Sequence, residues 1–310
     1  MHVLPLIQHL ENKEIDKALW DDCITRSNTG LIYAKTFYLD NMAKGWSALV
    51  GDNYGWVFPV TARKKYGVSY LCQPAFTQQL GTFSKPGVTV PYTQVIAYLQ
   101  GKYRLCEINW NFGLQQGLEG LSVSVEKATN FVLDLSQPST IITENYHRDL
   151  AKNLKKNKRF NHRYVATNDF KKCIEVYRHQ YGKRMPHVSE YDYKNFDKIC
   201  LDIYKQGKVI CREVVNEKQV LMATALLLFD GKRLYNLMNS TTDLGRKTGA
   251  NHFLLNALIE EFSGKEITLD FEGSDLPGVR SFYENFGGVN QSYFKIKYNH
   301  LSWPFRLFKK

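Results

Sequence analysis

The stretch ITLDFEGSDLPGVRSFYENFGG, residues 267–288, decides the fold of the chain. It begins with apolar and β-branched residues, as strands do, and a segment rich in glycine and proline then predicts a loop. From Val279 to Phe286 apolar residues recur three and four positions apart, which predicts a helix that ends at the following glycines. Asp270 and Glu272 are two apart, so on a strand their side chains share one face. Catalytic groups often gather at such strand ends, so this stretch is the first candidate for a site.

Composition narrows the class of protein. The 310 residues are 44% hydrophobic and 14% aromatic, enough for one large core or two medium ones. The net charge of +11, from 41 basic and 30 acidic residues, favours anionic partners, with a merely basic surface as the equally weighted alternative. The six cysteines show no CxxC spacing and the eight histidines no metal-ligand spacing, so we expect buried free thiols and no metal. The absence of a leader-like or long apolar segment predicts a cytoplasmic protein without a membrane-spanning helix.

Two successive sets of elements follow the same order, in which helices precede a strand meander, a further helix and a strand. In the first half we expect strands at 46–50, 54–61, 68–72 and 103–110, and a helix at 91–99. In the second we expect strands at 208–215, 219–229, 233–239, 266–272 and 292–298, and helices at 144–156, 249–262 and 279–286. Each strand–helix–strand step gives a parallel pair in an otherwise antiparallel sheet. The sequence therefore predicts an α+β (mixed α/β) fold of two tandem units, residues 1–130 and 131–310.

Part of the deciding stretch also carries a family resemblance. RSFYENFG at 280–287 resembles the last helix motif of the GNAT superfamily, the acyl-CoA N-acyltransferase fold, which often reads Ala-Arg-x-Phe-Tyr-x-x-x-Gly-Phe. DFEG at 270–273 followed by FYENFG is similar to the Fem-like branch, whose pattern is Asp-Phe-Gly-Gly, a loop, then Phe-Lys-x-x-Phe-Gly. The chain departs from that pattern at Tyr283, where the Fem-like motif has lysine. Weaker matches at 73–81 and 131–135 extend the resemblance over most of the chain. It implies two GNAT-like units, each a mostly antiparallel sheet flanked by helices, with the first degenerate and the second catalytic.

The resemblance implies an N-acyltransferase that moves an acyl or aminoacyl group from a thioester or ester donor to an amine acceptor. Its donor would be acyl-CoA or, as in Fem-type cell-envelope modification, aminoacyl-tRNA. A catalytically degenerate protein that binds a ligand or partner is the second alternative. Such transfer needs a base and an acid, for which Glu272 and Tyr283 are the candidates, with Asp270 beside them. Core packing of Tyr283, and pairing of Asp270 with a basic side chain, are the structural alternatives.

The segment GRKTGAN at 245–251 lies between a predicted strand and a predicted helix, where backbone N–H groups and the positive helix end suit a pyrophosphate. The family has Arg/Gln-x-x-Gly-x-Gly/Ala here, and the chain departs from it at Asn251, where a small residue is usual. In the family the preceding strand holds the acyl carbonyl with backbone groups, which would stabilise an oxyanion. Plain sheet core and an ordinary connection are the alternatives. The resemblance implies a cofactor site at Met238, Asn239, Ser240, Gly245, Arg246, Lys247, Thr248 and Gly249.

Two basic segments complete the candidates. Residues 148–163 hold seven cationic residues and one acidic residue, and an apolar stripe through Leu150 and Leu154 predicts an amphipathic helix. Its outward cations would contact tRNA phosphates or form an ordinary solvated face. The tail at 300–310 mixes aromatic and basic residues, which suits an anionic membrane surface or packing back onto the fold. The cations of the helix at 148–163 that are predicted to face outward are Lys152, Lys155, Lys156 and Arg159. The sequence indicates no stable protein partner.

Overall fold

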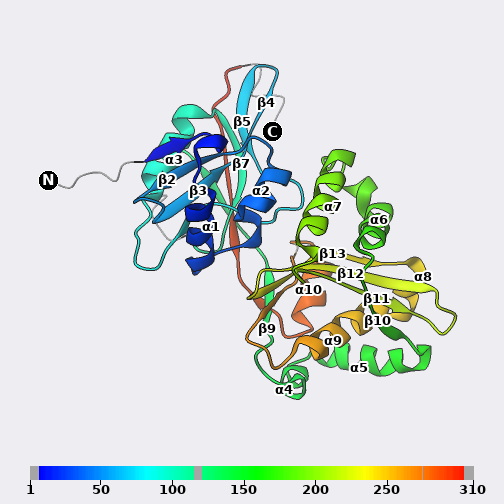
Figure 1. The fold of residues 1–310 in the computed structure, drawn as a ribbon. Coiled ribbons are helices and arrows are strands. Elements are labelled where there is room, and N and C mark those ends of the chain that lie inside the picture. The colour runs from blue at the N-terminus through cyan, green and yellow to red at the C-terminus, as the bar shows by residue number, and fades with distance from the viewer. Residues whose placement is uncertain (1–6, 115–120, 274, 304–310) are drawn as a thin grey trace. The chain divides into compact units, whose positions relative to one another are not determined.

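The computed structural model describes residues 7–114, 121–273 and 275–303 and has the mixed α+β architecture that the sequence predicts. The chain divides into two compact units (Figure 1). The first comprises residues up to Ala128 together with the segment from Ser292, and the second comprises Thr129–Gln291. Each unit has an apolar core of its own, so each satisfies the basic requirement of an independent domain.

The division differs from the expected 1–130 and 131–310 at its C-terminal end. The predicted last strand exists as β16 (Tyr293–Asn299), but it pairs with β7 (Leu105–Trp110) and β8 (Ser124–Ala128) of the first unit. In Figure 1 this strand, coloured red, runs alongside β7. The apolar side chains of Ile296 and Tyr298 are buried in the first core, which explains why the strand belongs there. The second unit is therefore inserted between two segments of the first.

The first unit contains two sheets, with strand orders β1-β2-β3-β6 and β4-β5-β7-β16-β8. The chain changes sheet between β3 and β4, so the expected three-strand meander is wrong at that step. The expected parallel pair is confirmed as β5 and β7. The remaining elements are β1 (Gln8–Leu10), β2 (Ser47–Gly51), β3 (Trp56–Val60), β4 (Ala62–Lys65), β5 (Val68–Cys72), β6 (Phe83–Ser84), α1 (Lys17–Arg26), α2 (Thr36–Met42), α3 (Tyr92–Lys102), η1 (Asn12–Glu14) and η2 (Ile32–Ala34).

The second unit is built on one sheet with strand order β10-β11-β12-β13-β14-β9-β15. Its single parallel pair within the described residues is β13 with β14, as the strand–helix–strand step predicts. The strands are β9 (Phe131–Asp134), β10 (Arg163–Thr167), β11 (Val209–Val215), β12 (Leu221–Phe229), β13 (Arg233–Thr241), β14 (Thr268–Asp270) and β15 (Val289–Asn290). The helices are α4 (Ser139–Glu144), α5 (Arg148–Asn157), α6 (Phe170–Tyr181), α7 (Glu190–Tyr204), α8 (Asp243–Thr248), α9 (Ala250–Phe262) and α10 (Pro277–Glu284), with η3 (Lys158–Phe160) and η4 (Gly182–Arg184).

Helices cover both faces of this sheet, α6 and α7 one face and α5 and α9 the other (Figure 1). This is why β12 reads LMATALLLF without a polar face: all but its two end residues are buried. Ala223, Ala225 and Leu227 contribute to the core beneath α9. A sheet covered on both faces leaves a polar side chain in its central strands without access to water, and this makes any such residue conspicuous.

Three local predictions differ from the structure. β14 ends at Asp270, so Glu272 follows the strand instead of sharing a strand face with Asp270. The helix expected from Val279 begins at Pro277, which occupies its first turn, a position that proline tolerates. The helix expected at 144–156 is two helices, α4 and α5, which end and begin on either side of residues 145–147.

Candidate functional site

The two central strands of the second unit separate part-way along their length. β13 pairs with β14 only from Arg233 to Tyr235, opposite Thr268–Asp270. β13 then continues to Thr241, hydrogen-bonded on its other side to β12. Beyond Tyr235 the edge of β13 that faced β14 therefore has no β14 partner. Such a gap exposes backbone donors and acceptors inside a sheet, where a bound ligand can use them.

Asn236 is the first residue of β13 beyond this pairing. It is 2% exposed, and neither its amide nitrogen nor its amide oxygen has a hydrogen-bond partner among the described residues. Buried polar side chains are nearly always hydrogen-bonded, so an asparagine left unpaired on both sides is a candidate for contact with a ligand or an ordered water. Sequence reasoning missed it, although one signal was present: a lone amide in the otherwise apolar run Leu-Tyr-Asn-Leu-Met.

The three β13 residues expected to line the site divide between the two faces of the sheet. Met238 and Ser240 share one face of β13 and Asn239 lies on the other, but the register with β12 shifts between Tyr235 and Met238, so this alternation does not continue to Asn236. Ser240 lies opposite Thr224 of β12, and both hydroxyl groups are buried without a partner in the described chain. All three residues lie on the part of β13 beyond its pairing with β14.

Tyr283 is held near the end of β14 by helix α10. Its ring stacks on Phe271, with centroids 4.7 Å apart and planes 20° apart. Burial raises the pKa of the Tyr283 phenol, and the neighbouring phenols of Tyr181 and Tyr177, then the carboxylates of Glu272 and Asp270, raise it further. Tyr283 is therefore protonated at neutral pH, and it lies among two tyrosines of α6 that the sequence did not single out.

Asp270 is fully engaged by protein groups. Its carboxylate, 1% exposed, accepts a hydrogen bond from the Arg233 guanidinium at 2.7 Å on one oxygen. The other oxygen accepts from the Asn130 amide and from the Glu272 backbone N–H, each at 3.0 Å. Asn130 in turn accepts from the Gly273 backbone N–H at 2.9 Å. Asp270 and Asn130 thus fix the loop that follows β14.

Glu272 occupies that loop in a left-handed backbone conformation, with φ of 54°. For a residue other than glycine this conformation is uncommon and costs about 1–2 kcal/mol. Hydrogen bonds from the loop backbone to Asp270 and Asn130 hold it in place. Strained backbone of this kind is found at functional sites, where it fixes the direction of a side chain.

The segment 245–249 is not the open turn that the sequence predicts, because residues 243–248 form the short helix α8. The Thr242 hydroxyl accepts from the Gly245 backbone N–H at 3.0 Å and caps this helix. Arg246 is bonded to Asp243 and Gln180. Gly249 then joins α8 to α9 with φ of 67°, and a Cβ there would lie 2.7 Å from the Asn157 side-chain oxygen, so glycine is needed. Lys247 and Thr248 complete α8, and binding of a pyrophosphate here stays a prediction.

The predicted amphipathic helix is confirmed as α5, followed by η3. Leu150 is buried and Leu154 packs against the core. The Asn157 amide donates to the Gly249 carbonyl at 2.8 Å, so the end of this helix adjoins the α8–α9 junction. Arg148 and Lys158 are exposed, as are the four cations predicted to face outward, which are Lys152, Lys155, Lys156 and Arg159.

Other groups named from the sequence lie away from this arrangement. Five of the six cysteines are buried and all are free thiols, and burial raises the pKa of Cys23 to about 11 and that of Cys106 to about 12. The described helices include none long and apolar enough to cross a membrane. The tail expected to contact a membrane falls mostly at 304–310, outside the described residues, although Trp303 before it is 80% exposed.

Comparison with known proteins identifies the fold. No family model and no curated protein sequence matches the chain. Its structure aligns with that of FemX over 97% of this chain and 99% of FemX, with a TM-score of 0.64 at 13% identity. The chain has the Fem-like GNAT fold. The C-terminal domain of a putative lysylphosphatidylglycerol synthetase from Agrobacterium fabrum aligns over 94% of both chains, with a TM-score of 0.54 at 10% identity. L-PGS from Bacillus licheniformis aligns over 95% of both, with a TM-score of 0.53 at 10% identity.

Proposed function

We propose that the second unit of this Fem-like fold transfers an acyl or aminoacyl group from a thioester or ester donor to an amine acceptor. The observation that carries the proposal is the buried amide of Asn236, unpaired within the described chain, where β13 separates from β14. A carbonyl placed in this gap would accept a hydrogen bond from that amide and from the unpaired backbone of β13. Fixed donors of this kind stabilise the negative charge that develops on the carbonyl oxygen during acyl transfer.

The reaction forms a C–N bond and breaks the C–S or C–O bond of the donor. The amine nitrogen attacks the carbonyl carbon, and a base takes the proton that the nitrogen loses. An acid gives a proton to the departing thiolate or alkoxide. Glu272 is the proposed base, since its backbone is fixed at the end of β14. Tyr283 is the proposed acid, because stacking on Phe271 holds it beside the end of β14 and its phenol is protonated at neutral pH.

Asp270 has a different function in this proposal. Both of its oxygens accept hydrogen bonds from the protein, and its ion pair with Arg233 is buried. A carboxylate so engaged has no oxygen left to contact an incoming amine. We therefore propose that Asp270 is a positioning residue that holds the Glu272 loop.

The donor carries phosphate groups in both versions of the proposal. Acyl-CoA would place its pyrophosphate near the α8–α9 junction, but the contacts of Arg246 with Asp243 and Gln180 close part of that region. The exposed cations of α5 and η3 adjoin the same junction through the Asn157–Gly249 hydrogen bond. Their position favours the second candidate, an aminoacyl-tRNA donor, because a row of cations suits a phosphate backbone.

The test is donor turnover by the full chain. Acetyl-CoA and bulk aminoacyl-tRNA would each be offered with a panel of primary amines and lysine-containing peptides, and released thiol or discharged tRNA would be measured. Tyr283→Phe and Glu272→Gln should each lower turnover about 10²-fold or more. Tyr146→Phe is the matched control. Tyr146 is another tyrosine of this unit, and its own hydroxyl is buried without a partner among the described residues. If the protein turns over neither donor, or if both variants turn over donor at the wild-type rate, the degenerate, ligand-binding alternative is favoured.

A further inference from the structure

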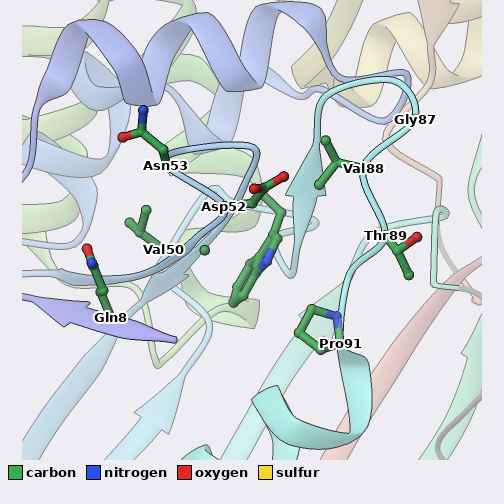
Figure 2. Close-up of a pocket in the computed structure, with 10 residues that line it drawn as sticks. Gln8, Val50, Asp52, Asn53, Gly87, Val88, Thr89 and Pro91 are labelled. Atoms are coloured by element: carbon green, nitrogen blue, oxygen red, sulfur yellow. The ribbon is translucent and has the colours of Figure 1, made fainter. Parts of the chain in front are cut away.

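The first unit contains a pocket of about 570 Å³, a size that holds a small organic ligand. Its walls come from the turn between β2 and β3, the beginning of β3, the first strand and the segment before α3. Figure 2 shows Asp52 and Asn53 on the turn, with Val88 and Thr89 on the segment across from it. The pocket belongs to a unit for which no activity is proposed above, so an inference about it does not depend on acyl transfer.

Trp56 gives this pocket a buried donor. The side chain is 1% exposed, and its indole N–H has no hydrogen-bond partner in the described chain. Gly51, which also lines the pocket, lets the ring pack directly on the backbone: a Cβ at this position would lie 2.3 Å from the indole nitrogen. A donor buried without a partner is rare in folded proteins, and a ligand acceptor in the pocket would satisfy it.

Asp52 supplies a negative charge at the same pocket. Asp52, Asn53 and Tyr54 are three consecutive non-glycine residues with positive φ, at 53°, 47° and 61°. The Tyr54 hydroxyl accepts from the Asp16 backbone N–H at 2.8 Å and helps to hold this strained turn. Strained turns of this kind occur at ligand-binding sites, where they direct side chains.

Asp52 has no ion pair with a described residue, although the chain is strongly basic. The cations close to it in the sequence or on neighbouring elements are already engaged. Lys85 pairs with Asp22 at 2.7 Å, and Lys102 contacts His9 at 2.8 Å. The carboxylate is thus available to a cation from outside the protein.

Helix α3 contributes a partial positive charge, opposite in sign to the Asp52 carboxylate. Pro91 lines the pocket and is the N-cap of α3, directly before Tyr92, and it provides no side-chain cap. The positive end of this eleven-residue helix therefore lies at the pocket, which Trp56 also lines. Val50 and Val88 add apolar surface.

We infer that this pocket binds a small aliphatic α-amino acid. The ammonium group would pair with Asp52, the carboxylate would accept from the Trp56 indole N–H near the α3 N-terminus, and the aliphatic side chain would contact Val50 and Val88. The proposal requires both charged groups of the ligand, which distinguishes it from binding of a simple amine or a simple carboxylate.

The experiment follows the indole N–H resonance of Trp56 in the full chain by NMR, with Trp56→Phe used to assign it. The probes are L-leucine, isopentylamine, which lacks the carboxylate, and 4-methylpentanoate, which lacks the ammonium. Leucine should shift the resonance, and each of the other probes should bind about 10-fold or more weakly, because each loses a charge-assisted hydrogen bond.

Asp52→Asn is the variant that tests the charge without disturbing the fold, since asparagine adopts the left-handed conformation readily. It should weaken leucine binding about 10-fold and leave 4-methylpentanoate binding unchanged. Glu144→Gln, which removes an exposed carboxylate of the second unit, should change neither leucine binding nor 4-methylpentanoate binding. The inference is overturned if leucine leaves the Trp56 resonance unmoved, if Asp52→Asn binds leucine as the wild type does, or if isopentylamine binds as tightly as leucine.

Discussion

Replacing Asn236 by leucine should raise the stability of the protein and remove its activity. Leucine has nearly the shape of asparagine but no polar atoms. Asn236 is 2% exposed with both amide atoms unpaired among the described residues, and a buried amide in that state costs the fold about 1–3 kcal/mol. Asn236→Leu should therefore increase the free energy of unfolding by about 1–2 kcal/mol. For a unit of this size each kcal/mol raises the melting temperature by about 2–4 °C.

The same substitution removes the proposed oxyanion donor. Loss of one such donor lowers acyl-transfer rates by about 10²–10³-fold. Stability would be measured by thermal and urea unfolding, and activity by single-turnover transfer from whichever donor the wild type uses. A functional residue whose removal stabilises the protein is difficult to explain by packing alone, so the two changes together test the proposal.

Thr224→Val is the matched control. Its hydroxyl is also buried without a partner in the described chain, but Thr224 is on β12, which borders β13 on the side away from β14. This variant should gain stability as well, by roughly 1 kcal/mol, and keep its activity. The reasoning is refuted if Asn236→Leu is destabilised and transfers at the wild-type rate.

Four further predictions concern other residues of the two units. Tyr283→Phe should keep the stacking on Phe271 and change the unfolding free energy by less than about 0.5 kcal/mol while transfer falls, so a large drop in melting temperature would contradict it. Arg233→Met should cost about 3–5 kcal/mol, because it leaves Asp270 buried and unpaired, and a second change, Asp270→Asn, should restore most of the loss in urea unfolding. Burial, with Tyr98 and Glu11 adding to it, raises the pKa of Tyr103 to about 12. Above pH 10, the ordinary pKa of tyrosine, the unfolded chain therefore holds fewer protons than the folded one, and stability falls as pH rises. The Tyr103→Phe variant should show a smaller fall in the urea midpoint, measured from about pH 9 to 11. Reversal of charge at Lys155, Lys156 and Arg159 should abolish transfer from aminoacyl-tRNA, and any tRNA binding that remains should depend less steeply on salt, whereas full activity would exclude that donor site.

The sequence predicted the elements around the site where their apolar spacing was regular. The spacing that ends at Phe286 indicated α10, and the strand–helix–strand order indicated the parallel pairing of β13 with β14. Spacing of this kind reflects burial of one helix face or of a whole strand, so it can be recognised without knowing which other elements pack against it. It also indicated the exposed cations of α5.

The partners themselves were not predictable. The alternation of apolar residues in β16 indicates a strand, but not that it joins the sheet of the first unit, because pairing depends on which edges are left open elsewhere. Pairing of Asp270 with a basic side chain was one alternative from the sequence, but only the structure identifies the partners as Arg233 and Asn130. The short helix α8 had a readable signal in its Thr242 cap, which a family pattern for a glycine-containing turn obscured.

The most direct test of the central claim is the melting temperature of the full chain with acetyl-CoA and with bulk aminoacyl-tRNA. A donor that binds the folded state stabilises it by about 2.7 kcal/mol at a hundred times its Kd. The account predicts that at least one donor raises the melting temperature, and that the response to tRNA weakens steeply with salt. If neither donor changes the melting temperature at saturating concentration, the second unit is not an acyltransferase that uses these donors.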